Sequence, residues 1–300
     1  VIYTDSVTSL IASLLNPADN TGIAAGDTYL SIEILTGSDI AGAGDTLVAS
    51  DAFGATLNGL KGDDTLFGRA GGDTLIGGDG DDTLLGGFGS GADTLEGGAG
   101  DDNLNGEGGI DTISFLSSGG VTFVLGAGGN GSANLAASLL GTDTYSNIEN
   151  IDGSNTGLDD LTGNSDANRI RGFGGGDYLD GAGGSDTIEG GAGDDTIVGG
   201  LGDDTLDGGA ANDTFEFFGN SGVGTFTGND TILNFEKVAG AGGDKINLYN
   251  GDPVNDFWAL FEIGGNTEFQ FFESDESAFI QTITVVGVVG LVAGDDYFVI

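Results

Sequence analysis

The sequence predicts an all-β fold: a parallel β-roll, a right-handed, β-helix-like solenoid, in two repeat blocks with a C-terminal β-rich cap. Three observations predict it. A nine-residue motif recurs in register in two stretches of the chain, Gly and Asp dominate that motif, and one apolar residue keeps a constant place in it. A disordered Gly-rich linker is the alternative, but it would have no reason to keep Leu or Ile at a fixed position.

The first block covers residues 59–114. Its repeats are GLKGDDTLF, GRAGGDTLI, GGDGDDTLL, GGFGSGADTLE with two extra residues, GGAGDDNLN and GEGGIDTIS. The sixth position holds an Asp in every repeat: Asp64, Asp73, Asp82, Asp93, Asp102 and Asp111. The eighth position is always apolar: Leu66, Leu75, Leu84, Leu95, Leu104 and Ile113.

The second block covers residues 163–218. Its repeats are GNSDANRIR, GFGGGDYLD, GAGGSDTIE, GGAGDDTIV, GGLGDDTLD and GGAANDTFE. The sixth position holds Asn168, Asp177, Asp186, Asp195, Asp204 and Asp213. The eighth position holds Ile170, Leu179, Ile188, Ile197, Leu206 and Phe215.

Three further segments complete the domain organisation. Residues 1–58 are a partial first section leading into the roll, residues 115–162 are an inter-block β section, and residues 219–300 are a C-terminal cap. YLSIEILTGS, starting at Tyr29, matches YSNIENIDGS, starting at Tyr145, so a larger period of about a hundred residues encloses the small one. Because the first copy lacks preceding nonapeptides, we expect a fragment of a longer protein. The alternation of Val121, Phe123 and Leu125 predicts strands, but whether residues 115–162 continue the roll stays open.

The nine-residue period has a direct physical interpretation. The Gly- and Asp-rich part forms a tight turn, because Gly adopts positive φ at little steric cost. The Thr-Leu-x part forms a three-residue strand with one side chain facing inward. Two nonapeptides make one coil, and stacked coils place the eighth-position side chains in a thin continuous core.

The same stacking places each sixth-position Asp beside its equivalent two repeats later. Asp64 is therefore expected beside Asp82, Asp73 beside Asp93, and Asp177 beside Asp195. Carboxylates about 4.7 Å apart repel by roughly 3–4 kcal/mol at an effective dielectric of 20, so we expect a cation between them. The chain has no Cys and no His, so its ligands must be oxygens.

Ca2+ fits such a site better than Mg2+, because it accepts flexible shells of carboxylate and carbonyl oxygens. The expected total is about eight ions, four in each block. The carbonyl ligands expected from the turns are those of Gly77, Gly78, Gly80, Gly97, Gly98, Gly100, Gly190, Gly191, Gly193, Gly199, Gly200 and Gly202. Folding is then expected to depend on Ca2+.

Composition excludes several other partners. The formal net charge of −42 disfavours nucleic acid and anionic lipid surfaces. The longest apolar stretch, residues 283–293, is far shorter than the roughly 20 residues that a bilayer requires, so no membrane insertion is expected. A catalytic carboxylate pair is disfavoured, because the Asp pairs recur at every repeat whereas catalysis needs one distinctive pair.

The repeats resemble the GGxGxDxUx nonapeptide of RTX proteins, most closely in GGDGDDTLL, GGAGDDTIV and GGLGDDTLD. Asn168, Ala92 and Ala211 depart from that motif, and Ser90-Gly91 lengthens one turn. The resemblance implies bound calcium, an extracellular location and export by a type I secretion machinery that reads an uncleaved C-terminal signal.

The tail carries a second resemblance. GNDTILNFEKVAGAGGDKINL is similar to the segment after the roll in serralysin-type secreted proteins, at Asp230, Phe235, Asp244 and Ile246. The ending AGDDYFVI resembles the secretion signal of that group, with Asp295 and Asp296 as the acidic part and residues 297–300 as the apolar part.

Two functions are consistent with these features. The first is a non-catalytic calcium-binding module that folds on extracellular Ca2+ and supports secretion and folding of a larger protein, whose activity would lie upstream. The alternative is a structural surface protein, an adhesin or S-layer-like assembly, in which Ca2+ stabilises the roll and self-assembly is expected.

Overall fold

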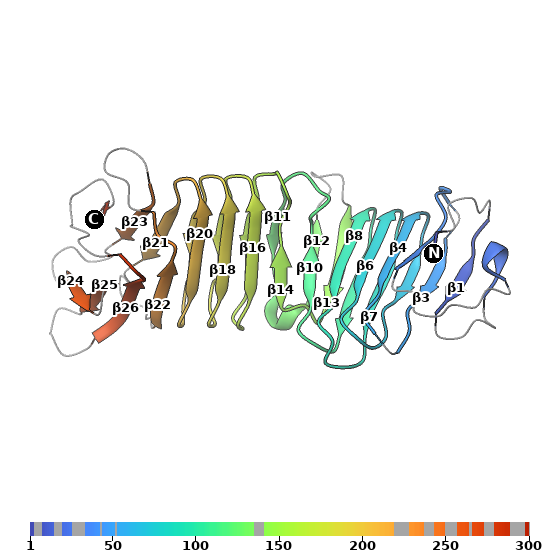
Figure 1. Cartoon of the computed structure of the whole chain (residues 1–300), viewed down its shortest axis with the longest axis horizontal. Coiled ribbons are helices and arrows are strands. Elements are labelled where there is room, and N and C mark those ends of the chain that lie inside the picture. Colours follow the sequence, from blue (N-terminus) through green and yellow to red (C-terminus); the bar gives the residue numbers. More distant parts are fainter. Residues whose placement is uncertain are drawn as a thin grey trace. The chain divides into compact units, whose positions relative to one another are not determined.

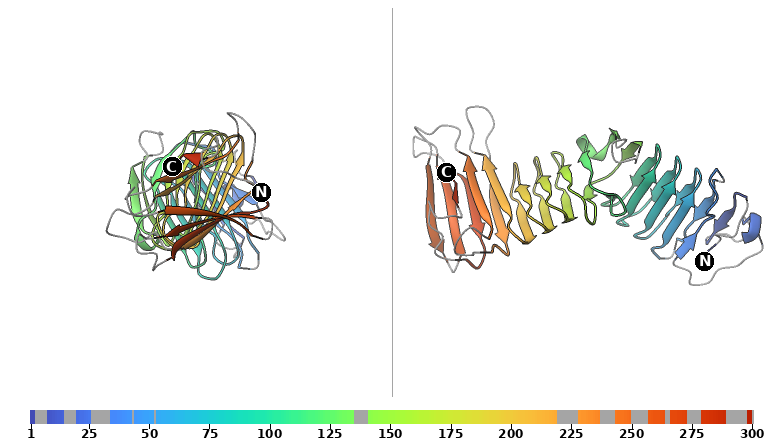
Figure 2. Two further views of the ribbon diagram at one scale, coloured as in Figure 1. Left: turned by 90° about the vertical axis from the view of Figure 1, so that its left-hand side faces the viewer. Right: turned by 90° about the horizontal axis from the view of Figure 1, so that it is seen from above.

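The computed structural model describes residues 1–2, 8–14, 20–25, 34–42, 44–51, 53–134, 141–218, 228–236, 243–249, 257–263, 266–272, 279–288 and 298–299 (Figure 1). The chain divides into two compact units. Unit 1 comprises Val1–Ser118 and Leu125–Asp152, and unit 2 comprises Gly119–Val124 and Gly153–Ile300. Within each unit the strands stack side by side into a solenoid (Figure 2).

Unit 1 has two facing rows of strands. One row has the order β1-β3-β5-β7-β9-β13-β12, and the other has the order β2-β4-β6-β8-β10-β14. The first row consists of β1 (Ile11–Ser13), β3 (Thr46–Val48), β5 (Thr65–Phe67), β7 (Thr83–Gly87), β9 (Asn103–Glu107), β13 (Thr142–Ser146) and β12 (Gly131–Asn134). The second consists of β2 (Ile34–Thr36), β4 (Thr56–Lys61), β6 (Thr74–Asp79), β8 (Thr94–Ala99), β10 (Thr112–Ser114) and β14 (Asn150–Asp152). The described part of unit 1 also contains the short 3-10 helices η2 (Gly22–Ala24) and η3 (Ala127–Gly129).

Unit 2 repeats this arrangement and adds a cap. One row has the order β11-β15-β17-β19-β21-β23-β27, and the other β16-β18-β20-β22-β26-β25-β24. The first row consists of β11 (Thr122–Val124), β15 (Asp160–Thr162), β17 (Tyr178–Asp180), β19 (Thr196–Val198), β21 (Thr214–Phe218), β23 (Lys245–Tyr249) and β27 (Phe298–Val299). The second consists of β16 (Arg169–Gly174), β18 (Thr187–Ala192), β20 (Thr205–Ala210), β22 (Gly228–Leu233), β26 (Phe279–Val285), β25 (Asn266–Phe272) and β24 (Phe257–Ile263).

The parallel β-roll predicted from the sequence is confirmed. Strands two repeats apart pair in parallel with equivalent positions aligned, as Leu75 with Leu95 and Ile188 with Leu206. The eighth-position residues of both blocks are at most 1% exposed and form the core. This register follows from the short strand, because a slip of one residue would turn its single apolar side chain to solvent.

Between residues 115 and 162, the described strands β11, β13, β14 and β15 continue the roll within their units, whereas β12 pairs antiparallel with β13. β13 pairs in parallel with β9, and β14 with β10. β11 pairs in parallel with β15, and aligns Phe123 with Leu161. Val121, Phe123 and Leu125 are buried, as their alternation predicts.

The end of unit 2 changes from parallel coils to antiparallel strands. β26 pairs in parallel with β22, while β25 pairs antiparallel with β26 and with β24. These strands form the expected β-rich cap. The acidic part of the predicted secretion signal, Asp295 and Asp296, lies outside the described residues, as do Tyr297 and Ile300. No helix among the described residues is long and apolar enough to cross a bilayer.

Candidate metal sites in the turns

The turns owe their shape to left-handed backbone at the second and fourth positions of the repeat. In the third repeat these are Gly78 (φ 117°) and Gly80 (φ 142°). A Cβ on either residue would collide with a carbonyl of the preceding coil, at Leu60 and Gly62 respectively. Successive turns are therefore packed backbone on backbone, which leaves their carbonyl oxygens unshielded by side chains.

The sixth-position Asp side chains point into these turns. They form columns, because one carboxylate oxygen of each Asp accepts the backbone N–H of the equivalent residue one coil earlier, which in most cases is itself an Asp. In column 1 of unit 1, the N–H groups of Asp45, Asp64 and Asp82 donate to Oδ1 of Asp64, Asp82 and Asp102 at 2.6, 2.7 and 2.8 Å. The column ends where the N–H of Asp102 donates to Oδ1 of Asp143 at 3.0 Å.

Column 2 of unit 1 lies along the other edge. The N–H groups of Asp73 and Asp93 donate to Oδ1 of Asp93 and Asp111 at 2.7 and 2.8 Å. The column ends at Glu149, which accepts the N–H of Asp111 at 2.8 Å.

Unit 2 has the same construction. Column 3 is joined by four such bonds of 2.8–3.0 Å and consists of Asp159, Asp177, Asp195, Asp213 and Asp244. Column 4 is joined by three bonds of 2.8–3.0 Å and consists of Asn168, Asp186, Asp204 and Asp230. The neighbours expected from the sequence thus lie together.

The second carboxylate oxygen is used differently from the first. Oδ2 is buried without a hydrogen-bond partner in ten of the predicted site residues: Asp64, Asp73, Asp82, Asp102, Asp111, Asp177, Asp186, Asp195, Asp204 and Asp213. These residues are at most 2% exposed. A buried carboxylate oxygen without a donor is costly unless a cation neutralises it.

At three column ends, backbone N–H groups satisfy both carboxylate oxygens. Both oxygens of Asp45 accept N–H groups, from Leu10 and Ser38 at 2.9 and 2.6 Å. Asp159 and Asp244 are held in the same way at both oxygens. Oδ1 of Asn168, a predicted ligand, accepts the N–H of Asn164 at 2.8 Å.

Each unpartnered oxygen faces a Gly at the first position of its repeat. The space that a Cβ on Gly77 would occupy is bordered by Oδ2 of Asp82 and, at 2.5 Å, by the carbonyl oxygen of Gly97. The same pairing recurs at Gly190, bordered by Asp195 Oδ2 and, at 2.5 Å, by the carbonyl of Gly208. Only Gly leaves this space open for a carboxylate and a carbonyl to converge.

The predicted carbonyl ligands all lie in these turns. Gly77, Gly97, Gly190 and Gly199 hold the first position, and their carbonyls border the open space of the preceding coil. The second-position Gly78, Gly98, Gly191 and Gly200 and the fourth-position Gly80, Gly100, Gly193 and Gly202 supply the left-handed backbone.

Burial dominates the electrostatics of the columns. It raises the pKa of Asp82 to about 8; the backbone bond to Asp64 opposes this shift, and the carboxylates of Asp102 and Asp64 add to it. Burial is also the main cause that raises the pKa to about 8 for Asp186 and to about 7 for Asp64, Asp73, Asp111 and Asp195. Without a cation, Asp82 and Asp186 favour the protonated form at pH 7, and the groups with a pKa of about 7 are about half protonated.

These donors fit a hard divalent cation. Within the described parts of the chain, no three acidic side chains gather closely enough to hold a metal by themselves. An ion would therefore combine carboxylates from two coils with turn carbonyls and water, a shell of oxygens that suits Ca2+. The expectation that only an ion separates neighbouring carboxylates is incomplete, because a backbone N–H already engages one oxygen of each.

Sequence reasoning missed several column members. Asp45, Asp143, Asp159 and Glu149 lie outside the predicted blocks. The first three could have been found from their spacing. Each lies two residues before a side chain that is buried, as the sixth position lies two residues before the eighth: Leu47, Tyr145 and Leu161.

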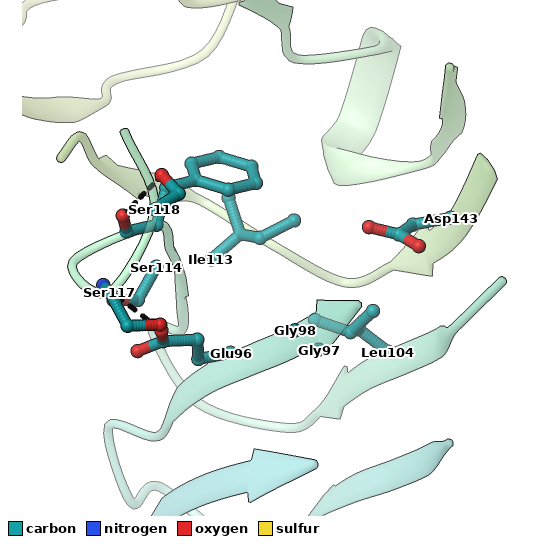
Figure 3. Close-up of a pocket in the computed structure, with 10 residues that line it drawn as sticks. Glu96, Gly97, Gly98, Leu104, Ile113, Ser114, Ser117, Ser118 and Asp143 are labelled. Atoms are coloured by element: carbon teal, nitrogen blue, oxygen red, sulfur yellow. Dashed lines mark hydrogen bonds between the residues drawn. The ribbon is translucent and has the colours of Figure 1, made fainter. Parts of the chain in front are cut away.

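Asp143 also lines a small cavity at the end of column 1. Its carboxylate and the Ile113 side chain lie on opposite sides of that cavity (Figure 3). The volume of about 10 Å3 is close to the minimum that one water molecule requires. The cavity therefore has room for about one water molecule beside the Asp143 carboxylate.

Comparison with known protein families decides what the turns are. The RTX calcium-binding nonapeptide repeat matches in four copies, at residues 58–91, 89–113, 154–188 and 180–215. The two blocks are RTX calcium-binding repeats. The third match begins before the predicted block and includes Asp159 of column 3.

One solved structure similar to this chain is the crystal structure of the extracellular lipase LipA from Serratia marcescens, with 18% sequence identity and a TM-score of 0.34. The similarity covers 89% of this chain and 42% of that chain, so the chain spans less than half the length of that protein. No curated protein matches the sequence.

Proposed function

We propose that the chain is a calcium-driven folding module of a larger exported protein. In the low Ca2+ of a bacterial cytosol the module stays unfolded, and outside the cell Ca2+ occupies the turns and drives folding. It carries out no chemistry itself. The observation that carries the proposal is the set of ten buried, unpartnered Asp oxygens, which makes the folded state dependent on an external positive charge.

The physical argument rests on the cost of the charged columns. At pH 7 the unfolded chain carries its carboxylates ionised and hydrated, whereas folding buries them with one oxygen unsatisfied. Neighbouring carboxylates in a column repel by roughly 3–4 kcal/mol at coil spacing and an effective dielectric of 20. A Ca2+ ion shared by two coils removes both penalties, and at 100 times Kd each site adds about 2.7 kcal/mol to stability.

Export follows from the same property. A chain that cannot fold before it meets millimolar Ca2+ stays extended and suits a type I secretion machinery, which transports unfolded chains. The sequence resemblance of the tail to serralysin-type proteins supports this step. The mature location is then extracellular, either secreted or at the cell surface.

A calcium titration tests the proposal. The full chain is placed in chelator at pH 7.5, and far-UV circular dichroism follows its conformation as Ca2+ or Mg2+ is added. We expect a cooperative coil-to-β transition with Ca2+ that Mg2+ does not reproduce, and sedimentation of the folded product as a monomer. A chain that is already β-structured in chelator contradicts the proposal, and a Ca2+-dependent oligomer supports the structural-assembly alternative.

A further inference from the structure

Column 2 of unit 1 ends in a turn that is not a nonapeptide. This short turn, residues 147–149, connects β13 to β14. A regular turn runs from the first to the sixth position of a repeat, as from Gly106 to Asp111, a separation of 111 − 106 = 5, while Asn147 and Glu149 are 149 − 147 = 2 apart. The short turn therefore lacks three residues of the motif.

Backbone hydrogen bonds fix the equivalent positions despite the deletion. The N–H of Thr112 donates to the carbonyl of Asp93 at 2.8 Å, and that of Asn150 donates to the carbonyl of Asp111 at 2.9 Å. Asn150 is thus the structural equivalent of a seventh position. Glu149, which precedes it, stands where every regular repeat of the block has its Asp.

Glu149 also makes the hydrogen bond of that missing Asp. Its Oε2 accepts the N–H of Asp111 at 2.8 Å, the distance at which Asp111 Oδ1 accepts the N–H of Asp93. The extra methylene of Glu brings a carboxylate to the column from a shorter loop.

The carbonyl part of the site is reproduced as well. In the preceding coil, the open space at Gly86 is bordered by Asp93 Oδ2 at 2.5 Å and the Gly106 carbonyl at 2.7 Å. One coil later, the open space at Gly106 is bordered by Asp111 Oδ2 at 2.5 Å and by the Asn147 carbonyl. Asn147 has left-handed backbone, with φ of 55°.

Asp111 supplies independent evidence for a ligand. It is 1% exposed, and its Oδ2 has no partner although it points into this space. The geometry points to an additional Ca2+ site formed by the Asp111 carboxylate of the last nonapeptide in the block together with the Asn147 carbonyl and the Glu149 carboxylate, which lie in a turn outside the RTX nonapeptides. The inference rests on the proposed calcium binding. It assigns Ca2+ to a turn that the RTX match, ending at residue 113 in this block, does not include.

Such a site has a structural consequence. Asp111 and Glu149 are 38 residues apart in sequence, so one ion would close that long excursion of the chain. Closing a long loop costs conformational entropy, and the binding energy of the ion would offset that cost. A filled site would therefore hold β14 more firmly against β10.

Ion counting on the full chain tests the assignment. Ca2+ bound per chain is measured by equilibrium dialysis and metal analysis for wild type, Glu149→Gln, Glu189→Gln and Asp82→Asn. The amide oxygen that Glu149→Gln introduces can still accept the Asp111 N–H, so the substitution removes charge and preserves the bond. Glu189 is an exposed residue of β18 and provides the matched control for the same chemical change.

We expect Glu149→Gln to bind one ion fewer, or to weaken one site at least tenfold, while Glu189→Gln matches wild type. Wild-type stoichiometry and affinity in Glu149→Gln, together with ion loss in Asp82→Asn, would overturn the extra site and leave the RTX sites intact. A wild-type chain that binds no Ca2+ would overturn the proposed function and this site together.

A second measurement avoids dependence on variant folding. Crystals of the wild-type chain grown with Ca2+ should show anomalous scattering about 2.3–2.6 Å from Asp111 Oδ2 and the Glu149 carboxylate. Ions in the nonapeptide turns with water at this position would refute the assignment.

Discussion

Replacing Asp82 by Asn should change stability in opposite directions with and without calcium. Asp82 lies in the middle of column 1, where its Oδ1 accepts the Asp64 N–H at 2.7 Å and its Oδ2 has no partner. Asn keeps an oxygen for the Asp64 N–H and removes the charge. The substitution therefore separates the cost of burying the carboxylate from the gain of binding an ion.

The magnitude follows from the pKa of Asp82, which burial raises from 3.8 to about 8. One pKa unit corresponds to about 1.4 kcal/mol, so folding at pH 7 without an ion costs at most about 4 kcal/mol at this residue. Asp82→Asn should recover part of that in chelator. With Ca2+ at 100 times Kd, the variant should instead lose about 2.7 kcal/mol for one missing site.

Two unfolding measurements check this. In Ca2+, guanidinium unfolding followed by circular dichroism measures how much unfolding free energy Asp82→Asn loses relative to wild type. In chelator, the concentration of a stabilising osmolyte that induces β structure measures how much stability the variant gains. Asp81→Asn is the matched control, because Asp81 is exposed and adjacent. Destabilisation of Asp82→Asn under both conditions, or behaviour equal to that of Asp81→Asn in Ca2+, would refute the reasoning.

Two further predictions concern pH and the Gly turns. Because burial raises the folded-state pKa of the column Asp residues to between about 6 and about 8, their contribution to stability in chelator is fully present below about pH 4 and is lost as pH rises to about 8. A circular dichroism pH titration in chelator should show β structure at acid pH, and a transition in the opposite direction would contradict the pKa shifts. Gly77→Ala places a Cβ against Asp82 Oδ2 and the Gly97 carbonyl, and should cost about 1–3 kcal/mol in Ca2+ as well as one site. Gly89→Ala is the control, since its Cβ would meet only Gly91 N at 3.8 Å; equal unfolding midpoints for the two variants would show that the space beside Gly77 does not matter.

The sequence by itself determined the roll and which residues line the turns at its edges. The nine-residue period specified the three-residue strands, the inward Leu and Ile, and the alignment of Asp residues two repeats apart. These features are local, because in the regular blocks the partner of each Asp is 18 residues away, or 20 where two residues are inserted. A repeated local pattern places equivalent atoms together without further information.

Tertiary structure alone decided how the columns end and how their oxygens are used. Asp102 meets Asp143, and Asp111 meets Glu149, at separations of 41 and 38 residues. The nine-residue period does not link these residues, so their pairing across the roll becomes visible only in the folded structure. The division between Oδ1, held by a backbone N–H, and Oδ2, left for a cation, also depends on the exact offset between coils. The physical reason is that side-chain hydrogen bonding responds to sub-ångström geometry, whereas the hydrophobic period fixes only which coil lies next to which.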